Sequence, residues 1–208
     1  MAGWAGIVFI VLNVVAFVMY GTPPSLDAPA AEIAEYLADV GDTYMAGIAI
    51  ALVAGIFASV FFAGLLIPYF RSDREHAEGY GTLLLIGAVF WGLLAEVGLV
   101  VSDILPYRGG AELDAATYRV FTDFGFLAYA ASGLAFVVVG LAAALAVRKR
   151  ALMPAWFGYL SWLAVVAGLL SALAVASESS LVMVFPGYAL EMIWVLSASI
   201  LLAREKSA

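Results

Sequence analysis

Two glutamates, Glu96 and Glu191, lie deep within stretches of the chain that otherwise have the composition of membrane-spanning helices. An ionised carboxylate in the hydrocarbon of a bilayer costs roughly a few kcal/mol, so such a residue faces a protein interior and is a functional candidate by default. A pair of carboxyls of this kind can load and release a proton, bind a cation, or act as general acid and base. These two residues are the first candidates for the chemistry of this chain.

Two aromatic side chains share the helical face of Glu191. Tyr188 precedes it by three residues and Trp194 follows it by three, so each lies about one turn away on the same side of a helix. Tyr188 could donate a hydroxyl and Trp194 an indole N–H to a carboxylate, and both rings could present their faces to a cation. We therefore expect both to contact whatever Glu191 binds.

The remaining predicted site residues depend on how the helices pack. If the third and sixth spans lie side by side, the carboxyls of Glu96 and Glu191 face one cavity and share a proton. We then expect Asp103 and Asp123 at the mouth of that cavity and Asn13 in its lining. The alternative is that each glutamate stays protonated and hydrogen-bonds a neighbouring helix, which would hold helices together without binding a ligand.

No further group of residues indicates a specific reaction. The chain has no cysteine and one histidine, which excludes disulfides, thiolate zinc sites, iron–sulfur clusters and bis-histidine haem. That histidine, His76, lies in a charged loop, where a solvated side chain is the ordinary case. We predict no metal, no cofactor and no nucleic-acid partner, and the lack of a nucleophile–base constellation disfavours an enzyme without excluding one.

The elements that position these residues are transmembrane helices. The chain is 65% hydrophobic and 12% charged, whereas about one-quarter of the residues in a soluble domain are charged. A cleaved signal peptide is an alternative for the first apolar segment, but no Lys or Arg precedes that segment. The sequence predicts an all-α integral membrane protein in which residues 1–208 form one polytopic domain, a six-helix bundle with spans at about 4–20, 44–68, 81–104, 120–147, 155–176 and 181–203.

The charges between the spans predict an orientation. With the N-terminus in the cytoplasm, seven of the nine basic residues fall on the cytoplasmic side, namely Arg71, Arg74, Arg148, Lys149, Arg150, Arg204 and Lys206. The opposite side is rich in acids. The positive-inside rule then predicts a protein of the cell (inner) membrane with both termini on the cytoplasmic side. The acidic outer side could concentrate cations, or it could simply be a solvated rim.

Two packing features accompany the spans. An amphipathic helix is predicted near Ala30–Val40 in the first outer loop, where it would lie as a lid or brace with its apolar stripe against the bundle or the lipid interface. Small residues recur every fourth position in the second span, from Gly47 to Ala63, and in the fifth, from Ala164 to Ala176. Such ridges allow close helix contacts within one chain or at the seam of a homodimer.

Two segments carry a family resemblance. The run from Ala151 to Leu160, with Pro154 and Trp156 just after three basic residues, and the closing segment around Glu191 and Trp194 both resemble a family of uncharacterised bacterial six-helix membrane proteins, a domain of unknown function. The resemblance covers the six-span layout and about the last third of the chain. It implies an all-helical fold and a place for Glu191 in the family pattern, but no activity.

Three functions remain open. The first is a small bacterial membrane protein that binds or translocates a proton or a small cationic or amphipathic solute through an outward-facing cavity that contains the glutamate pair. The second is an accessory or structural subunit whose partners are the bilayer, a second copy of the chain or a larger membrane complex. The third is an intramembrane enzyme that uses the glutamates as general acid and base on a lipid or isoprenoid.

Overall fold

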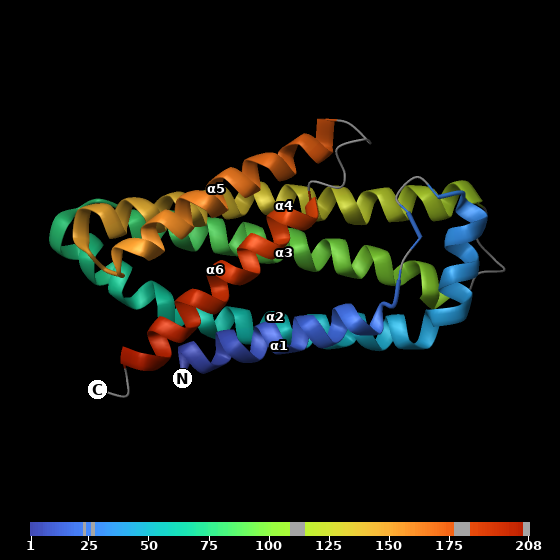
Figure 1. The fold of residues 1–208 in the computed structure, drawn as a ribbon, viewed down its shortest axis with the longest axis horizontal. Coiled ribbons are helices and arrows are strands. Elements are labelled where there is room, and N and C mark those ends of the chain that lie inside the picture. Colours follow the sequence, from blue (N-terminus) through green and yellow to red (C-terminus); the bar gives the residue numbers. More distant parts are fainter. Residues whose placement is uncertain (23, 26–27, 109–114, 177–183, 206–208) are drawn as a thin grey trace.

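The computed structural model of this chain is all-helical, and the six apolar helices make it a multi-pass membrane protein. The structure describes residues 1–22, 24–25, 28–108, 115–176 and 184–205. The helices are α1 (Ala2–Met19), α2 (Ala30–His76), α3 (Tyr80–Arg108), α4 (Ala115–Arg150), α5 (Ala155–Ala176) and α6 (Val184–Glu205) (Figure 1). Each is long and apolar enough to cross a bilayer, so the predicted bundle of spans is confirmed.

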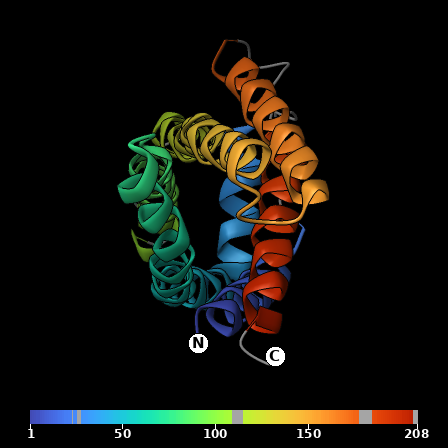
Figure 2. The same cartoon turned by 90° about the vertical axis from the view of Figure 1, so that its left-hand side faces the viewer.

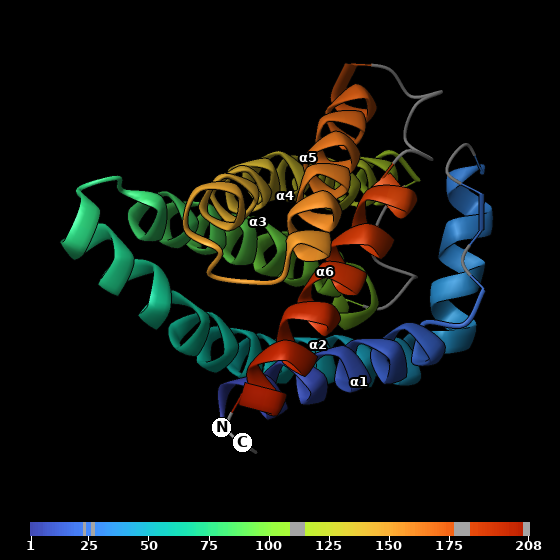
Figure 3. The same ribbon diagram turned by 60° about the vertical axis from the view of Figure 1, so that its left-hand side comes forward.

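The helices form a ring in chain order. Each helix packs against the next one along the chain, and α6 closes the ring by packing against α1. Seen from the end that carries both termini, α3 and α6 lie on opposite sides of this ring (Figure 2). The helix α6 also runs obliquely across the bundle rather than parallel to α3 and α4 (Figure 3). We call the end of the bundle with both termini the termini end, and the other the pocket end.

The predicted amphipathic helix is present, but it is not a separate element. Residues 30–40 form the first part of α2, which is continuous to His76. This part, which we call the arm, runs across the pocket end before α2 turns along the bundle (Figure 1). Its apolar stripe is buried as expected, because Ile33 and Leu37 pack with Leu105 of α3 and Tyr118 of α4. No loop separates the arm from the second span, because residues 41–43 are helical as well.

Aromatic side chains fill the centre of the ring. Trp91 of α3 contacts the rings of Phe9, Phe62 and Phe136, which come from α1, α2 and α4, edge to face. Phe136 in turn contacts Trp194 of α6. Such edge-to-face pairs contribute about 0.5–1.5 kcal/mol each beyond the area that they bury. With Phe157 of α5, which contacts Trp194, this aromatic cluster includes a residue from each of the helices α1 to α6.

Polar contacts fasten the helix ends at the termini end. The carboxylate of Asp73 in α2 accepts hydrogen bonds from the backbone N–H groups of Tyr80 (2.8 Å) and Gly81 (2.7 Å) at the start of α3. These are two of the N–H groups that a helix start leaves without a partner of its own. Arg150, at the end of α4, donates two hydrogen bonds of 2.8 and 2.7 Å to Glu78. That contact holds the pKa of Glu78 below its usual value.

The small-residue ridges serve packing within the chain over part of their length. Gly47 lies against the ring of Tyr20 and the carbonyl of Ala16 in α1. In α5, Gly168 lies so close to the carbonyl of Gly133 in α4 that a Cβ there would be 2.5 Å from the oxygen. The later part of the α2 ridge faces outward, because Ala63 is exposed. That outward part is the surface on which a homodimer seam stays a prediction.

Candidate functional site

Glu191 is enclosed in the middle of the bundle. Its side chain is 1% exposed, and its Oε2 accepts a hydrogen bond of 2.8 Å from the indole Nε1 of Trp91. Its Oε1 faces Gly133 of α4, where a Cβ would lie 3.4 Å from that oxygen. A buried carboxyl needs a hydrogen bond of this kind, because nothing in hydrocarbon replaces one that is lost.

The donor to Glu191 differs from the one the sequence suggests. Trp194 is completely buried, but its indole Nε1 donates to the hydroxyl of Ser161 on α5 at 2.8 Å. The hydroxyl of Ser161 in turn donates a hydrogen bond to the backbone carbonyl of Phe157. Trp194 therefore joins α6 to α5, and the expectation that it donates to Glu191 is wrong. Trp91 makes that contact instead.

Trp91 is the residue that the sequence reasoning missed. It lies five residues before Glu96, about 7.5 Å of helix rise, and points to the interior while Glu96 points to one side. A signal was present in the sequence, since a tryptophan in the middle of a span must find an acceptor for its N–H. A buried glutamate on another span is such an acceptor.

Glu96 lies in a different environment, at the seam between α3 and α2. Its side chain is half-buried, and its Oε1 lies against the Cα of Gly55, because a Cβ built on that glycine would be 1.9 Å from the oxygen. No residue in the described part of the chain gives the Glu96 carboxyl a hydrogen bond or an ion pair. The absence of a side chain at Gly55 is what gives this carboxylate its place.

The two glutamates do not form a pair. The predicted side-by-side packing of the third and sixth spans is not found, since α3 packs on α2 and α4 while α6 packs mainly on α1 and α5 (Figure 2). The indole of Trp91 lies between α3 and Glu191, and Glu96 points instead to Gly55. The two carboxyls are therefore separate groups with separate partners.

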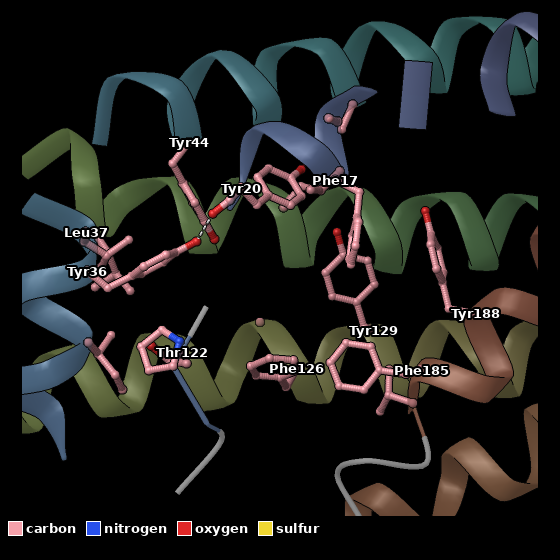
Figure 4. Close-up of a pocket in the computed structure, with 18 of the residues that line it drawn as sticks. Phe17, Tyr20, Tyr36, Leu37, Tyr44, Thr122, Phe126, Tyr129, Phe185 and Tyr188 are labelled. Atoms are coloured by element: carbon pink, nitrogen blue, oxygen red, sulfur yellow. Dashed lines mark hydrogen bonds between the residues drawn. The ribbon is translucent and has the colours of Figure 1, made fainter. Parts of the chain in front are cut away.

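A cavity of about 240 Å³ lies toward the pocket end and is lined by residues of α1, of the arm and span of α2, and of α3, α4 and α6. Its wall is largely aromatic and apolar and contains no charged side chain (Figure 4). The lining residues that carry the argument below are five tyrosines, at positions 20, 36, 44, 129 and 188, with Phe17, Phe126 and Phe185. Asn13, Ser25 and Thr122 supply the remaining polar groups. We call this cavity the aromatic pocket.

Hydrogen bonds and ring contacts fix the aromatic side chains. Tyr188 donates to the Oδ1 of Asn13 at 2.9 Å, so α6 and α1 meet at the inner end of the aromatic pocket. Toward the arm, the hydroxyl of Tyr36 donates to the backbone carbonyl of Tyr20. The ring of Tyr44 contacts both of these tyrosines. The predicted polar lining by Asn13 and Tyr188 thus lies in this aromatic pocket rather than around the glutamates.

The glutamates lie just beyond the inner end of the aromatic pocket. Ala51 lines it one helical turn before Gly55, and Leu99 lines it one turn after Glu96. Tyr188 lines it one turn before Glu191. Neither glutamate lines the aromatic pocket itself. The cavity and the carboxyls are neighbours, not one site.

The two aspartates contribute less than expected. Asp123 lies 3.5 Å from the guanidinium Nε of Arg119, one turn before it on α4, and Arg119 also donates to the carbonyl of Ala28 just before the arm. Asp123 therefore lies beside the aromatic pocket without lining it. The predicted role of Asp103 falls on a side chain outside the described part of the structure.

Comparisons with protein-family models, with the curated proteins and with the solved structures give no match to this chain. The resemblance to a family of six-helix membrane proteins therefore stays an expectation. Within the residues that the structure describes, no group of histidines and carboxylates is arranged to hold a metal ion. The aromatic pocket and the two separate carboxyls are the features on which a function can be argued.

Proposed function

We propose that this protein binds a small amphipathic cation in the aromatic pocket. The observation that carries the proposal is the wall of five tyrosines and three phenylalanines around a cavity of about 240 Å³. The negative face of an aromatic ring attracts a cation by about 0.5–2 kcal/mol, and the larger values apply where water is excluded. The apolar wall accepts the hydrophobic part of the same molecule.

The polar groups of the aromatic pocket support the amphipathic character of the ligand. Asn13 and Tyr188 lie together at the inner end, and Thr122 and Ser25 lie elsewhere along the wall. A few placed polar groups in an apolar cavity orient a ligand. With no basic side chain in the wall, nothing there repels a positive charge.

The orientation that we propose makes the aromatic pocket face the outside of the cell. The positive-inside rule places both termini in the cytoplasm, and the pocket end is the opposite end of the bundle (Figure 1). Because the chain has no cysteine, single cysteines test this cleanly. A membrane-impermeant maleimide should label Ser25→Cys in intact cells and Glu75→Cys only after lysis, and the reverse result would invert the orientation.

The binding proposal is tested by calorimetric titration of the purified protein with benzyltrimethylammonium. Benzyl alcohol is the control ligand, because it keeps the aromatic body and has no charge. We expect the cation to bind about tenfold more tightly, which corresponds to about 1.4 kcal/mol of cation–ring attraction. Replacement of Phe126 by Ala should weaken binding, whereas replacement of the exposed Phe124 of the same helix should not. Equal affinity for the two ligands, or no binding of either, would contradict the proposal.

An alternative function has one observation in its favour. The outward-facing part of the small-residue ridge on α2, which includes Ala63, suits a helix of another chain, as an accessory subunit would require. Replacement of Ala63 by Leu would then break a complex that the wild-type protein carries through purification. A single mass for the wild-type protein in native mass spectrometry would argue against that function.

A further inference from the structure

We propose that Glu96 forms a second site, separate from the aromatic pocket, in which a carboxylate at the bilayer-facing seam of α2 and α3 binds the ammonium group of a membrane-dissolved amphiphile. The proposal rests on four features of the seam: its exposure to lipid, the space in it, the missing counter-ion and its depth.

The seam faces lipid on both sides. On α3, Leu93 and Val100 flank Glu96 and are 56% and 51% exposed. On α2, Ile56 follows Gly55 directly and is 64% exposed. Large apolar side chains with this exposure on a membrane-spanning helix contact acyl chains. The half-buried Glu96 lies at the edge of that surface, so a molecule in the bilayer can reach it without entering the bundle.

The seam also has room. Gly55 has no side chain where the Glu96 oxygen lies. Gly92 is one turn before Glu96, and a Cβ built on it would meet no atom within 4 Å. Gly55 thus gives the carboxyl oxygen its place, and Gly92 leaves open space on the same helix one turn from Glu96, from which an ammonium group can approach the carboxylate.

A counter-ion for this carboxylate is missing from the described residues. The nearest described guanidinium along α4, that of Arg119, is taken up by Asp123 and by the carbonyl of Ala28. A carboxylate in lipid is stabilised most by a cation that comes to it, because attraction strengthens as the dielectric constant falls.

The depth selects the kind of amphiphile. Glu96 lies five residues before Val101, where the apolar part of α3 ends, and that is about 7.5 Å below the end of the span at 1.5 Å per residue. The ammonium of a phospholipid stays in the headgroup layer. A single-chain amphiphile has no phosphate or glycerol group that holds its ammonium in that layer, so its ammonium can approach Glu96 along the helices.

The test is protection of Glu96 from the lipid-soluble reagent dicyclohexylcarbodiimide, read by mass spectrometry of the modified peptide. A protonated carboxyl adds across the carbodiimide and rearranges to a stable N-acylurea, so the adduct keeps all atoms of both molecules. The protein is reconstituted in phosphatidylglycerol vesicles. We expect labelling at Glu96 and none at the enclosed Glu191, which serves as the control within the same chain. Labelling of both, or of neither, would overturn the proposal.

The ligand class is tested by competition. Octyltrimethylammonium at about ten times its dissociation constant should slow labelling of Glu96 about tenfold by mass action, while the neutral octan-2-one should not. Protection by phosphatidylcholine vesicles alone would assign the ammonium to a lipid headgroup instead. Equal protection by the cation and the ketone would overturn the site.

Two glycine variants separate this site from a general effect on folding. Gly55→Ala places a methyl 1.9 Å from the Glu96 oxygen, so the carboxylate must move and protection should be lost. Gly92→Ala adds the same methyl to open space and should keep protection. Protection that survives in Gly55→Ala would contradict the geometry. Phe126→Ala, which damages the aromatic pocket, should leave protection of Glu96 unchanged, and its loss there would place the ligand in that cavity.

Discussion

Replacing Trp91 by Phe tests the enclosed carboxyl most sharply. A phenyl ring can still pack on Phe9, Phe62 and Phe136. It has no N–H group, however, so the Oε2 of Glu191 loses the 2.8 Å hydrogen bond that the indole of Trp91 donates. An unsatisfied buried acceptor lowers the free energy of unfolding by about 1–3 kcal/mol. Hydrogen bonds between membrane helices contribute about 0.6 kcal/mol on average and about 1.7 kcal/mol at most. We therefore expect a loss of about 1–2 kcal/mol, to which the smaller ring adds a packing loss.

A double-mutant cycle separates the hydrogen bond from the packing loss. The assay is unfolding in mixed micelles by titration with dodecyl sulfate, followed by far-ultraviolet circular dichroism. Trp91→Phe is measured in the wild-type chain and in Glu191→Met, where no acceptor remains. The packing loss is common to both, so the difference between the two values is the coupling energy, and we expect about 1 kcal/mol. A coupling energy near zero would refute the inferred bond between α3 and α6.

Three further predictions concern stability, measured by the same unfolding assay. Asp73→Ala should cost about 1 kcal/mol, because it removes the acceptor that caps the start of α3; an unchanged midpoint would contradict this. Because Arg150 lowers the pKa of Glu78, their contact stabilises the protein above the ordinary glutamate value of 4.5 and is lost as the pH falls below it. Glu78→Gln should therefore remove the part of the acid sensitivity that appears below pH 4.5, and unchanged acid sensitivity would refute the assignment. Gly168→Ala should destabilise by about 1–3 kcal/mol through overpacking against α4, whereas Gly41→Ala, with open space, should be neutral or stabilising by up to about 1 kcal/mol; similar effects of the two would contradict the close helix contact.

The spans could be predicted because each depends on local composition. Runs of apolar residues with a length of about 20 define helices in a bilayer almost without regard to their neighbours. Two local expectations are wrong. His76 is the last residue of α2 rather than part of a charged loop. The other concerns the arm, where the acids from Glu32 to Asp42 suggest an interruption before the second span. The helix nevertheless continues, because an amphipathic sequence can stay helical across the bundle end when Ile33 and Leu37 are buried there.

The site could be predicted only in part, because it depends on which helices are neighbours. Helical spacing correctly identifies Glu191 as an interior residue, and it places Asn13 and Tyr188 on interior faces where they meet. It gives no order of the helices around the ring. The prediction that Glu96 and Glu191 face one cavity depends on side-by-side packing of the third and sixth spans, and the ring instead puts α3 and α6 on opposite sides (Figure 2).

The aromatic pocket could not be predicted for a related reason. Its wall comes from α1 with the segment after it, α2, α3, α4 and α6, and each of these five parts of the chain contributes two to six lining residues. Tyr20, Tyr36 and Tyr44 are only sixteen and eight residues apart. They come together because the arm crosses the pocket end and returns the chain to the end of α1.

The most direct test of ligand binding in the aromatic pocket is a nuclear Overhauser measurement with benzyltrimethylammonium. The protein is deuterated except at its tyrosines, so that only tyrosine ring protons can show contacts with the ligand. Binding in the aromatic pocket predicts contacts from the methyl protons of the ammonium to ring protons of Tyr20, Tyr36 or Tyr44, which line the cavity. The exposed Tyr159 of α5, which is remote from the lining, should give no contact. Contacts to Tyr159 alone, or to no tyrosine at a ligand concentration that saturates the titration, would contradict it.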